Sequence, residues 1–383
     1  MKQIPMLDLK LEYEYMKDEI DKAIKKCLDH QHWILGPEVK ELEEKVASYL
    51  DMKNCIGVSS GTDALVLSLR ALSIKLKKKE YFDKNDWIIT TPFTFTATGD
   101  AILRAGATPV FIDIDPETYN IDTSKIKDYL NSNEGKRVIG IVPVHLYGQS
   151  CEMDKILKLA KEFNLFIVED VAQAFGGMWK GKKLGSIGEL GAFSFFPSKN
   201  LGCFGDGGMV STSDNELAEI VKMLLKHGGK DKYNVNHIGY NARLDTLQAS
   251  VLITKIKYID EFNEKRREIA ECYKKGLSAV KGITIPEVIK DTLHVFHQYT
   301  IRVNSNIRTE LQNFLTDKGI STMVYYPFPL NKMKVFENKS ISYLSLDNAK
   351  KASEEVLSLP IEPLQKYEDT NYIIDCLNKF FMQ

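Results

Sequence analysis

The amino-acid sequence predicts an α/β protein, in which a large domain with a mostly parallel sheet flanked by helices precedes a smaller α+β domain. A chain of 383 residues exceeds the usual size of a single domain. In its first part, short apolar runs alternate with amphipathic helical stretches, the pattern of parallel strands covered on both faces. After about residue 213 the pattern changes to longer helices. We therefore predict a large domain at residues 1–245, including an N-terminal arm, and a connecting helix with a small domain at residues 246–383.

Helix and strand signals alternate through the large domain. The segment "GPEVKELEEKVASYL" has Pro37 just inside a helix start and places Val39, Leu42, Val46 and Leu50 on one face. A second helix follows in "SSGTDALVLSLRAL", and another in "CEMDKILKLAKEF". Strands are predicted at "WIITT", "TPVFIDI", "RVIGIVPV", "LFIVED", "GAFSF" and "GMVST".

The C-terminal part begins with a long helical stretch, "ARLDTLQASVLITKIKYIDEFNEKRREIAECYKKGL", whose length suits a connector between two domains. Strands are predicted near "HQYTIRV" and "STMVYYPF", with helices near "RTELQNFLTDKG" and at the C-terminus. The lysine-rich segment "KLKKKEYFDKND" is predicted to be a solvated, peripheral loop.

Composition argues against nucleic acid or membrane partners. The chain has 51 Lys and Arg against 52 Asp and Glu, a net charge of −1, so no global field attracts polyanions. Its six cysteines show no zinc-ligand spacing, which favours reduced thiols and no metal site. No apolar run approaches the roughly 18 residues of a membrane helix. We expect a soluble, cytoplasmic protein that binds its partners through a pocket.

In open parallel sheets, ligands bind beyond the carboxyl ends of the strands. The segment "SSGTDAL" places small residues and free backbone N–H groups at a helix N-terminus, which suits a phosphate. The alternative is that Ser60 or Thr62 simply caps the helix.

The apolar strand in "LFIVEDVAQAFGG" ends at Asp170, with Gln173 able to point to the same side. A buried carboxylate is costly unless it meets a cation, and a protonated pyridine nitrogen is one such cation. A helix-capping aspartate is the alternative.

In "GAFSFFPSKNLGCFGDGG", Lys199 follows an apolar strand and precedes several glycines. Desolvation favours a neutral amine, the form that makes a Schiff base, whereas the alternative is a solvated loop lysine. Ser194 is close enough along the chain to reach a phosphate. Together the three segments supply a phosphate cradle, a partner for a ring nitrogen and a Schiff-base lysine, which is what pyridoxal phosphate requires.

The sequence resembles the DegT-type nucleotide-sugar aminotransferases, pyridoxal-phosphate enzymes of the aspartate aminotransferase fold (fold type I). The resemblance runs over nearly the whole chain, through "WILGPEVKELE", "SSGTDAL", "TPFTFTATGDAILRAGATPVFIDIDPETYNID", "PVHLYGQ", "VEDVAQAFGG", "SFFPSKNLGCFGDGG", "GYNARLDTLQA", "YYPFPLN" and "LSLPIEP".

This resemblance implies two catalytic residues, Lys199 as the Schiff-base lysine and Asp170 as the partner of the pyridine nitrogen. Gln173 would contact the cofactor's phenolic oxygen, and Phe95 would stack on the ring, although core packing is the alternative for Phe95. The implied phosphate contacts are Gly61, Thr62 and Ser194.

The resemblance also implies a homodimer with shared active sites, because Asn241 matches a residue that reaches the phosphate of the other subunit. Candidate substrate contacts are Lys232, Tyr233, Arg243 and Tyr326, although a structural salt bridge is the alternative for Arg243. Asn331 and Glu362 depart from the residues frequent in the family, which leaves the substrate open.

The implied reaction moves an amino group from L-glutamate, which leaves as 2-oxoglutarate, to a keto-sugar nucleotide, with pyridoxamine phosphate as the intermediate cofactor form. A C3 ketone on a UDP- or dTDP-linked hexose or hexuronate is favoured, for amino-sugar, lipopolysaccharide or other cell-surface polysaccharide biosynthesis. The alternatives are a C4-keto (4-keto-6-deoxy) acceptor, a pyridoxamine-phosphate-dependent sugar dehydratase, and a catalytically silent sugar-nucleotide sensor. Retention of Lys199 and Asp170 argues against the last two.

Overall fold

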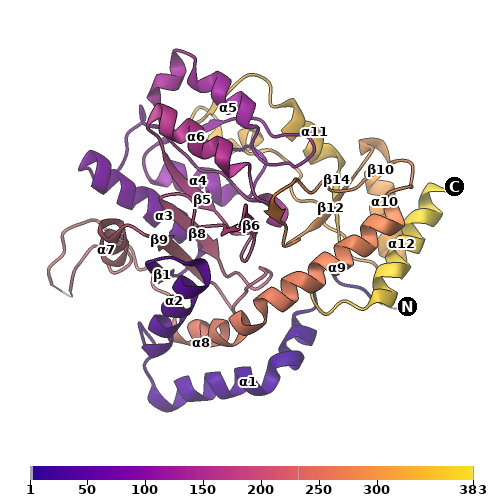
Figure 1. Ribbon diagram of the computed structural model, residues 1–383, viewed down its shortest axis with the longest axis horizontal. Helices are drawn as coiled ribbons and strands as arrows, with labels where there is room; N and C mark the ends of the chain where they lie inside the picture. The colour runs from indigo at the N-terminus through magenta and orange to yellow at the C-terminus, as the bar shows by residue number, and fades with distance from the viewer. Residues whose placement is uncertain (1–2, 232, 383) are drawn as a thin grey trace.

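The computed structural model describes residues 3–231 and 233–382 and has a large sheet flanked by helices, with a smaller sheet beside it (Figure 1). The large sheet has eight strands in the order β1-β9-β8-β5-β4-β2-β3-β13. Their bounds are β1 Asn54–Val58, β2 Trp87–Thr90, β3 Thr108–Phe111, β4 Val138–Ile141, β5 Phe166–Asp170, β8 Leu190–Ser194, β9 Gly208–Thr212 and β13 Ile341–Ser342. Pairings from β8 to β13 are parallel, whereas β9 pairs antiparallel with both β8 and β1.

All six strands predicted for the large domain are present, and the mostly parallel sheet is confirmed. The sheet separates two hydrophobic cores, and successive strand residues alternate between them. Ile167 packs in one core and Val168 in the other, and Ile89 and Ile88 divide in the same way. Burial on both faces explains why these strands read as continuous apolar runs. The strands β1 and β13 were not predicted.

Helices cover the large sheet on both faces (Figure 1). The predicted amphipathic helix α2 buries Val39, Leu42, Val46 and Leu50 as expected. The bounds of the helices in this region are α1 Leu9–His30, α2 Pro37–Leu50, α3 Gly61–Leu72, α4 Thr96–Arg104, α5 Thr123–Leu130, α6 Met153–Phe163, α7 Asn215–Leu224 and α8 Thr246–Lys255. No helix among residues 3–231 and 233–382 has the length and apolarity needed to cross a membrane.

The predicted connector is two helices, because a 3-10 turn at Ile256–Tyr258 separates α8 from α9 (Ile259–Leu277). Figure 1 shows α9 running from the large sheet towards the C-terminal elements. These are the sheet β10-β12-β14 (Ile283–Thr284, Tyr299–Val303, Val356–Leu359) and the helices α10 (Ser305–Asp317), α11 (Asp347–Glu355) and α12 (Tyr367–Phe381). A third small sheet joins β6 (Met178–Trp179), β7 (Lys182–Lys183) and β11 (Thr292–Leu293).

The C-terminal elements share a core of their own, which Ile4 of the N-terminal arm joins by bridging to Ile320. In the opposite direction, β13 from the C-terminal part extends the large sheet by pairing with β3. The domain boundary after residue 245 stays a prediction.

One prediction about secondary structure was wrong, and another holds only in part. The segment "STMVYYPF" forms only one isolated bridge, between Met323 and Ser358, because its chain then turns so that Tyr325 and Tyr326 line a cavity. The lysine-rich segment is also more than a solvated loop. It begins with a π-helical turn that extends α3, and Phe82 is buried in the core.

Candidate active site

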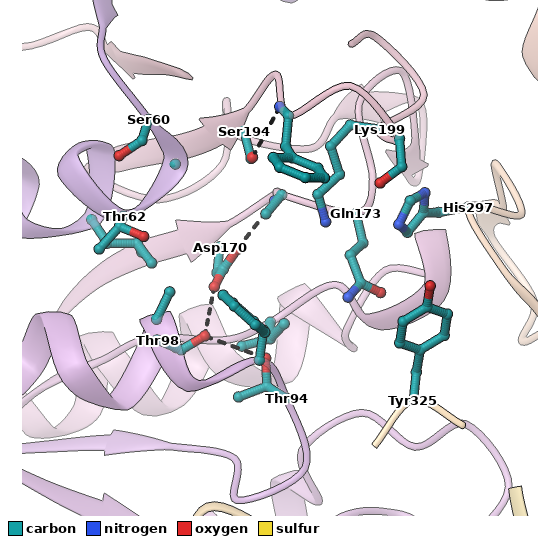
Figure 2. A pocket seen from close by; sticks show the side chains of 18 of the residues that line it. Ser60, Thr62, Thr94, Thr98, Asp170, Gln173, Ser194, Lys199, His297 and Tyr325 are labelled. Carbon is teal, nitrogen blue, oxygen red and sulfur yellow. Dashed lines mark hydrogen bonds between the residues drawn. The ribbon is translucent and has the colours of Figure 1, made fainter. Parts of the chain in front are cut away.

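One cavity of about 650 Å³ lies where β5 and β8 end and α3 begins (Figure 2). Eight of the predicted site residues line it, although they are spread over more than 260 positions of the sequence. They are Gly61, Thr62, Phe95, Asp170, Gln173, Ser194, Lys199 and Tyr326. This convergence is what the ends of parallel strands predict.

Lys199 lies in the loop after β8, where its backbone N–H donates to Phe196 O at 2.8 Å. Figure 2 shows its side chain extending into the cavity between Asp170 and His297. Desolvation by the surrounding protein lowers the pKa of Lys199 to about 8, against the opposing effect of the Asp170 charge. The neutral amine, which a nucleophile and proton carrier requires, is therefore much easier to form near physiological pH than it is for an exposed lysine.

Asp170 is the last residue of β5, and burial raises the pKa of its carboxyl group. Two hydrogen bonds oppose that effect. Thr98 Oγ1 donates to Oδ2 at 2.8 Å, and the Ala172 N–H donates to Oδ1 at 3.1 Å. Sequence reasoning missed Thr98, although it lies in "TPFTFTAT", three residues after Phe95. A buried carboxylate held by these donors and facing a cavity is suited to a cationic partner.

The amide of Gln173 has a defined orientation. The Tyr147 backbone N–H donates to its Oε1 at 2.8 Å, so the other amide atom is the nitrogen, which donates to Tyr326 OH at 2.8 Å. Tyr147 was not predicted, and its own hydroxyl donates to Tyr325 O. The two hydrogen bonds hold Gln173 at the cavity wall.

The other end of the cavity is formed by the N-terminus of α3 and the end of β8. Ser60 caps the helix by accepting from the Asp63 N–H at 3.0 Å, so the capping alternative for this residue is confirmed. A Cβ on Gly61 would lie 2.6 Å from Ser194 Cβ, and only glycine permits this close approach. Thr62 and Ser194 thus lie together at the positive end of a helix, a place suited to a phosphate.

His297 is a cavity residue that sequence reasoning missed. Asn200 Nδ2 donates to Val295 O at 3.0 Å, so Asn200 Oδ1 is the atom that accepts from His297 Nδ1 at 3.1 Å. The proton of the imidazole is therefore on Nδ1. Burial lowers the pKa of His297 well below its ordinary value, and the charge of Lys199 adds to this effect. His297 is a neutral imidazole whose Nε2 is free to accept a hydrogen bond.

A buried His145–Glu169 pair supports the end of β5. The Cys151 N–H donates to His145 Nδ1 at 3.1 Å, so His145 Nε2–H donates to Glu169 Oε2 at 3.1 Å. Glu169 also accepts three backbone N–H groups, from Gly185, Ile187 and Gly188. The acidic residue next to Asp170 is thus a structural anchor.

The remaining predicted site residues do not line the cavity of their own chain. Asn241 is exposed, and Arg243 donates to its Oδ1. The Ser59 N–H donates to Ala242 O at 3.0 Å, which places this segment beside the start of α3. Tyr233 is 83% exposed, and Lys232 lies outside the described residues.

Away from the cavity, Cys27, His30 and Glu38 place three metal-type donor atoms within 4.8 Å of one another. The carboxylate of Glu38 is already paired with Lys26 at 3.2 Å and with His30 at 3.2 Å. This cluster is accounted for as an ion-pair group at the start of α2.

Comparisons with known proteins agree with this geometry. Residues 14–378 match the DegT/DnrJ/EryC1/StrS aminotransferase family. The chain is 42% identical to the "Pleiotropic regulatory protein" of Geobacillus stearothermophilus (99% of this chain, 98% of the relative). It is 38% identical to the UDP-2-acetamido-2-deoxy-3-oxo-D-glucuronate aminotransferase of Pseudomonas aeruginosa (96% of each chain). It is 37% identical to the dTDP-3-amino-3,4,6-trideoxy-alpha-D-glucose transaminase of Streptomyces venezuelae (99% and 96%).

Two solved structures are similar along the whole chain. S. venezuelae DesV, in complex with a ketimine intermediate, superposes with a TM-score of 0.93 at 36% identity and full coverage of both chains. NtdA from Bacillus subtilis, with bound cofactor PMP, has a TM-score of 0.89 at 29% identity, covering 100% of this chain and 86% of the other. The type I pyridoxal-phosphate aminotransferase fold expected from the sequence is thereby confirmed. The chain belongs to the DegT/DnrJ/EryC1/StrS family of nucleotide-sugar aminotransferases.

Proposed function

We propose that this chain moves an amino group from L-glutamate to the C3 ketone of a UDP- or dTDP-linked hexose or hexuronate, in the synthesis of amino sugars for cell-surface polysaccharides such as lipopolysaccharide. The observation that carries the proposal is the convergence of the desolvated amine of Lys199, a half-buried residue, with the buried carboxylate of Asp170 in one cavity. Relatives with 3-oxo and 3-amino sugar nucleotides in their names support C3 over C4.

The cavity fits pyridoxal phosphate, because one of its ends suits the anionic phosphate of this molecule and the other suits its protonated ring nitrogen. Thr62 and Ser194 stand at the N-terminus of α3, where an anion is favoured, and Asp170 stands where a protonated ring nitrogen is favoured. When bound, this cofactor supplies an aldehyde that carries the amino group and a ring that accepts electrons from the reacting carbon. Phe95 and Gln173 would hold the ring face and its phenolic oxygen.

Lys199 has the main chemical role in this proposal. Its lowered pKa, about 8, would let the neutral amine take a proton from the α-carbon of glutamate and deliver it to the aldehyde-derived carbon of the cofactor. Asp170 keeps a proton on the ring nitrogen, and Thr98 holds the carboxylate in position. The same groups act in reverse order on the sugar ketone, because transamination is two half-reactions at one site.

The sugar nucleotide and the second subunit belong to the same proposal. Among the described residues of 227–245, none lines the cavity of its own chain, so their predicted contacts require a second copy of this chain. We propose a homodimer in which Asn241 reaches the partner's phosphate site. Lys232 and Tyr233 would reach the diphosphate of the sugar nucleotide across the dimer. Arg243 would also approach the substrate, and Tyr326 would do so from within the cavity.

The decisive experiment offers 3-keto and 4-keto sugar nucleotides, each UDP- or dTDP-linked, with glutamate, while 2-oxoglutarate is measured. Turnover confined to 3-keto compounds is the expected result. Turnover of 4-keto compounds alone would replace C3 by C4 in the proposal. Release of 2-oxoglutarate with no acceptor consumed would leave the donor half of the proposal standing and remove the acceptor half.

A further inference from the structure

The proposed function assigns no role to the lysine-rich segment "KLKKKEYFDKND". One of its residues, Glu80, contacts the segment after α7, more than 150 positions later, and the next, Tyr81, contacts Arg70, which also binds that segment. We call residues 227–231 and 233–240 the outer hairpin. The insertion was expected to be peripheral, but it supports the outer hairpin.

Backbone contacts join the two sides of the outer hairpin. A bridge joins Gly229 to Val235, and the Lys230 N–H donates to Asn234 O at 3.1 Å. Nearer the base, Gly228 O accepts from the Asn236 and His237 N–H groups at 3.0 and 3.2 Å. Figure 1 shows the segment projecting from the body of the molecule beside α7. Because an isolated two-stranded hairpin is only marginally stable, its direction depends on what holds its base.

Backbone hydrogen bonds from Gly228 to Met223 O, at 2.9 Å, and from Tyr240 to Leu224 O, at 2.7 Å, join that base to α7, and the carboxylate of Glu80 adds side-chain contacts to it. His237 Nδ1 lies 2.8 Å from Oε1, and the Ile238 N–H donates to Oε2 at 3.2 Å. Arg70 donates to the same Oε2 at 2.9 Å. One carboxylate thus joins two residues of the outer hairpin to a cation in the body of the protein.

That cation is fully buried. Arg70, on α3, also donates to Ile238 O at 2.9 Å and to Tyr240 OH at 2.8 Å, and the Tyr81 ring lies 3.8 Å from its guanidinium carbon. A buried guanidinium requires partners, so this contact is directional and not easily rearranged. These contacts join the outer hairpin to α3, the helix whose N-terminus forms the end of the cavity that suits a phosphate.

We propose that Glu80 is a positioning residue, which orients the outer hairpin and thereby controls affinity for the nucleotide of the substrate without taking part in amino transfer. The inference rests on the proposed function, in which this hairpin reaches the diphosphate in the partner's cavity. It deepens that function by assigning substrate affinity to an insertion remote from the reacting atoms. The step with glutamate needs no nucleotide, so Glu80 leaves it unaffected.

Glu80→Gln keeps the shape of the side chain but removes its charge, and one amide oxygen cannot replace two carboxylate oxygens. We expect the dissociation constant for UDP or dTDP to rise about tenfold, the size of one lost charge-assisted hydrogen bond. The rate of the glutamate step, followed by the absorbance of the cofactor, should stay unchanged. Asp83→Asn is the matched control, because the Asp83 carboxylate contacts only Asn85 and Lys79 of the same insertion.

The rate of trypsin cleavage after Lys230 is a second measurement of hairpin orientation, and it requires neither nucleotide nor turnover. Faster cleavage in Glu80→Gln than in Asp83→Asn supports the role of Glu80. Unchanged nucleotide affinity, equal cleavage, or a parallel loss of the glutamate step would each overturn it. A wild-type protein that binds neither UDP nor dTDP would overturn the proposed function and this inference together, an outcome distinct from failure of Glu80→Gln alone.

Discussion

The walls of the cavity and the outer hairpin differ in how each holds its side chains. In the cavity, Asp170 and Gln173 are buried at the ends of packed elements, and each has two hydrogen bonds within the chain. In the outer hairpin, Tyr233 is 83% exposed and the backbone is joined to the body mainly at its base. The comparison indicates that a single chain fixes the orientation of the polar side chains in its cavity, whereas it leaves the residues of the outer hairpin exposed.

The largest effect is expected at Lys199. Lys199→Met should lower turnover by at least about 10³-fold, because both the covalent link and the proton carrier are lost. Borohydride treatment followed by mass measurement should show cofactor attached to Lys199 in the wild type and to no residue in the variant. Attachment that persists in Lys199→Met would show that the cavity does not have the role assigned to it.

A pH-dependent stability difference is expected from the same burial. The pKa of Lys199 is 10.5 when exposed and about 8 in the fold, so between these values the unfolded chain binds a proton that the folded chain has lost. The stability of cofactor-free wild type relative to Lys199→Met should therefore rise between pH 8 and pH 10.5, by at most about 3 kcal/mol. Below pH 8 Lys199 is protonated in both the folded and the unfolded chain, so the difference in unfolding free energy between wild type and Lys199→Met no longer changes with pH. Urea unfolding of both proteins across this range measures it, and parallel curves would contradict the burial of the amine.

Asp170→Asn is expected to separate attachment from catalysis. The amide cannot stabilise a protonated ring nitrogen, so turnover should fall by about 10²-fold. Lys199 is untouched, so borohydride should still fix the cofactor to the protein. If the variant kept wild-type turnover, the buried carboxylate would have only a structural role.

Mixed dimers test whether each active site is shared between two subunits. Asn241→Ala alone should lose about tenfold in activity, the value of one phosphate contact. When Asn241→Ala and Lys199→Met subunits are dissociated and reassociated, half of the dimers contain one of each and one intact site, so about a quarter of wild-type activity should return. No recovery, with heterodimers demonstrated by mass, would mean that each site is built from one chain.

The smallest effect is expected at Thr98. Thr98→Val removes one donor to Asp170, which should lower turnover by roughly five- to tenfold. Thr94→Val is the control, because the Thr94 hydroxyl contacts Thr98, at 3.3 Å, and not the carboxylate. A pH profile should show the Asp170-linked limb displaced to higher pH in Thr98→Val only. Equal profiles for both variants would assign Thr98 to packing.

Local patterns in the sequence determined the six strands of the large domain and, through them, the residues of the cavity. Lys199, Asp170 and Ser194 each stand at or just after the end of a strand, and parallel strands end at one edge of a sheet. That rule needs no knowledge of which strands are neighbours. The strand β13 escaped prediction because a run of two residues carries no periodicity. The strand β1 also escaped, although it is as long as β5, β8 and β9.

Only the tertiary structure decided which groups hold those residues in place. Thr98 meets Asp170 across 72 positions and Asn200 meets His297 across 97, and neither contact leaves a local pattern because the partners come from different elements. The same holds for Glu80 and His237, which are separated by 157 positions. Their contact suggests a role for an insertion whose composition alone predicts a solvated loop. Periodicity reports which face of an element is buried, but the partner of a buried polar group is set by chain topology.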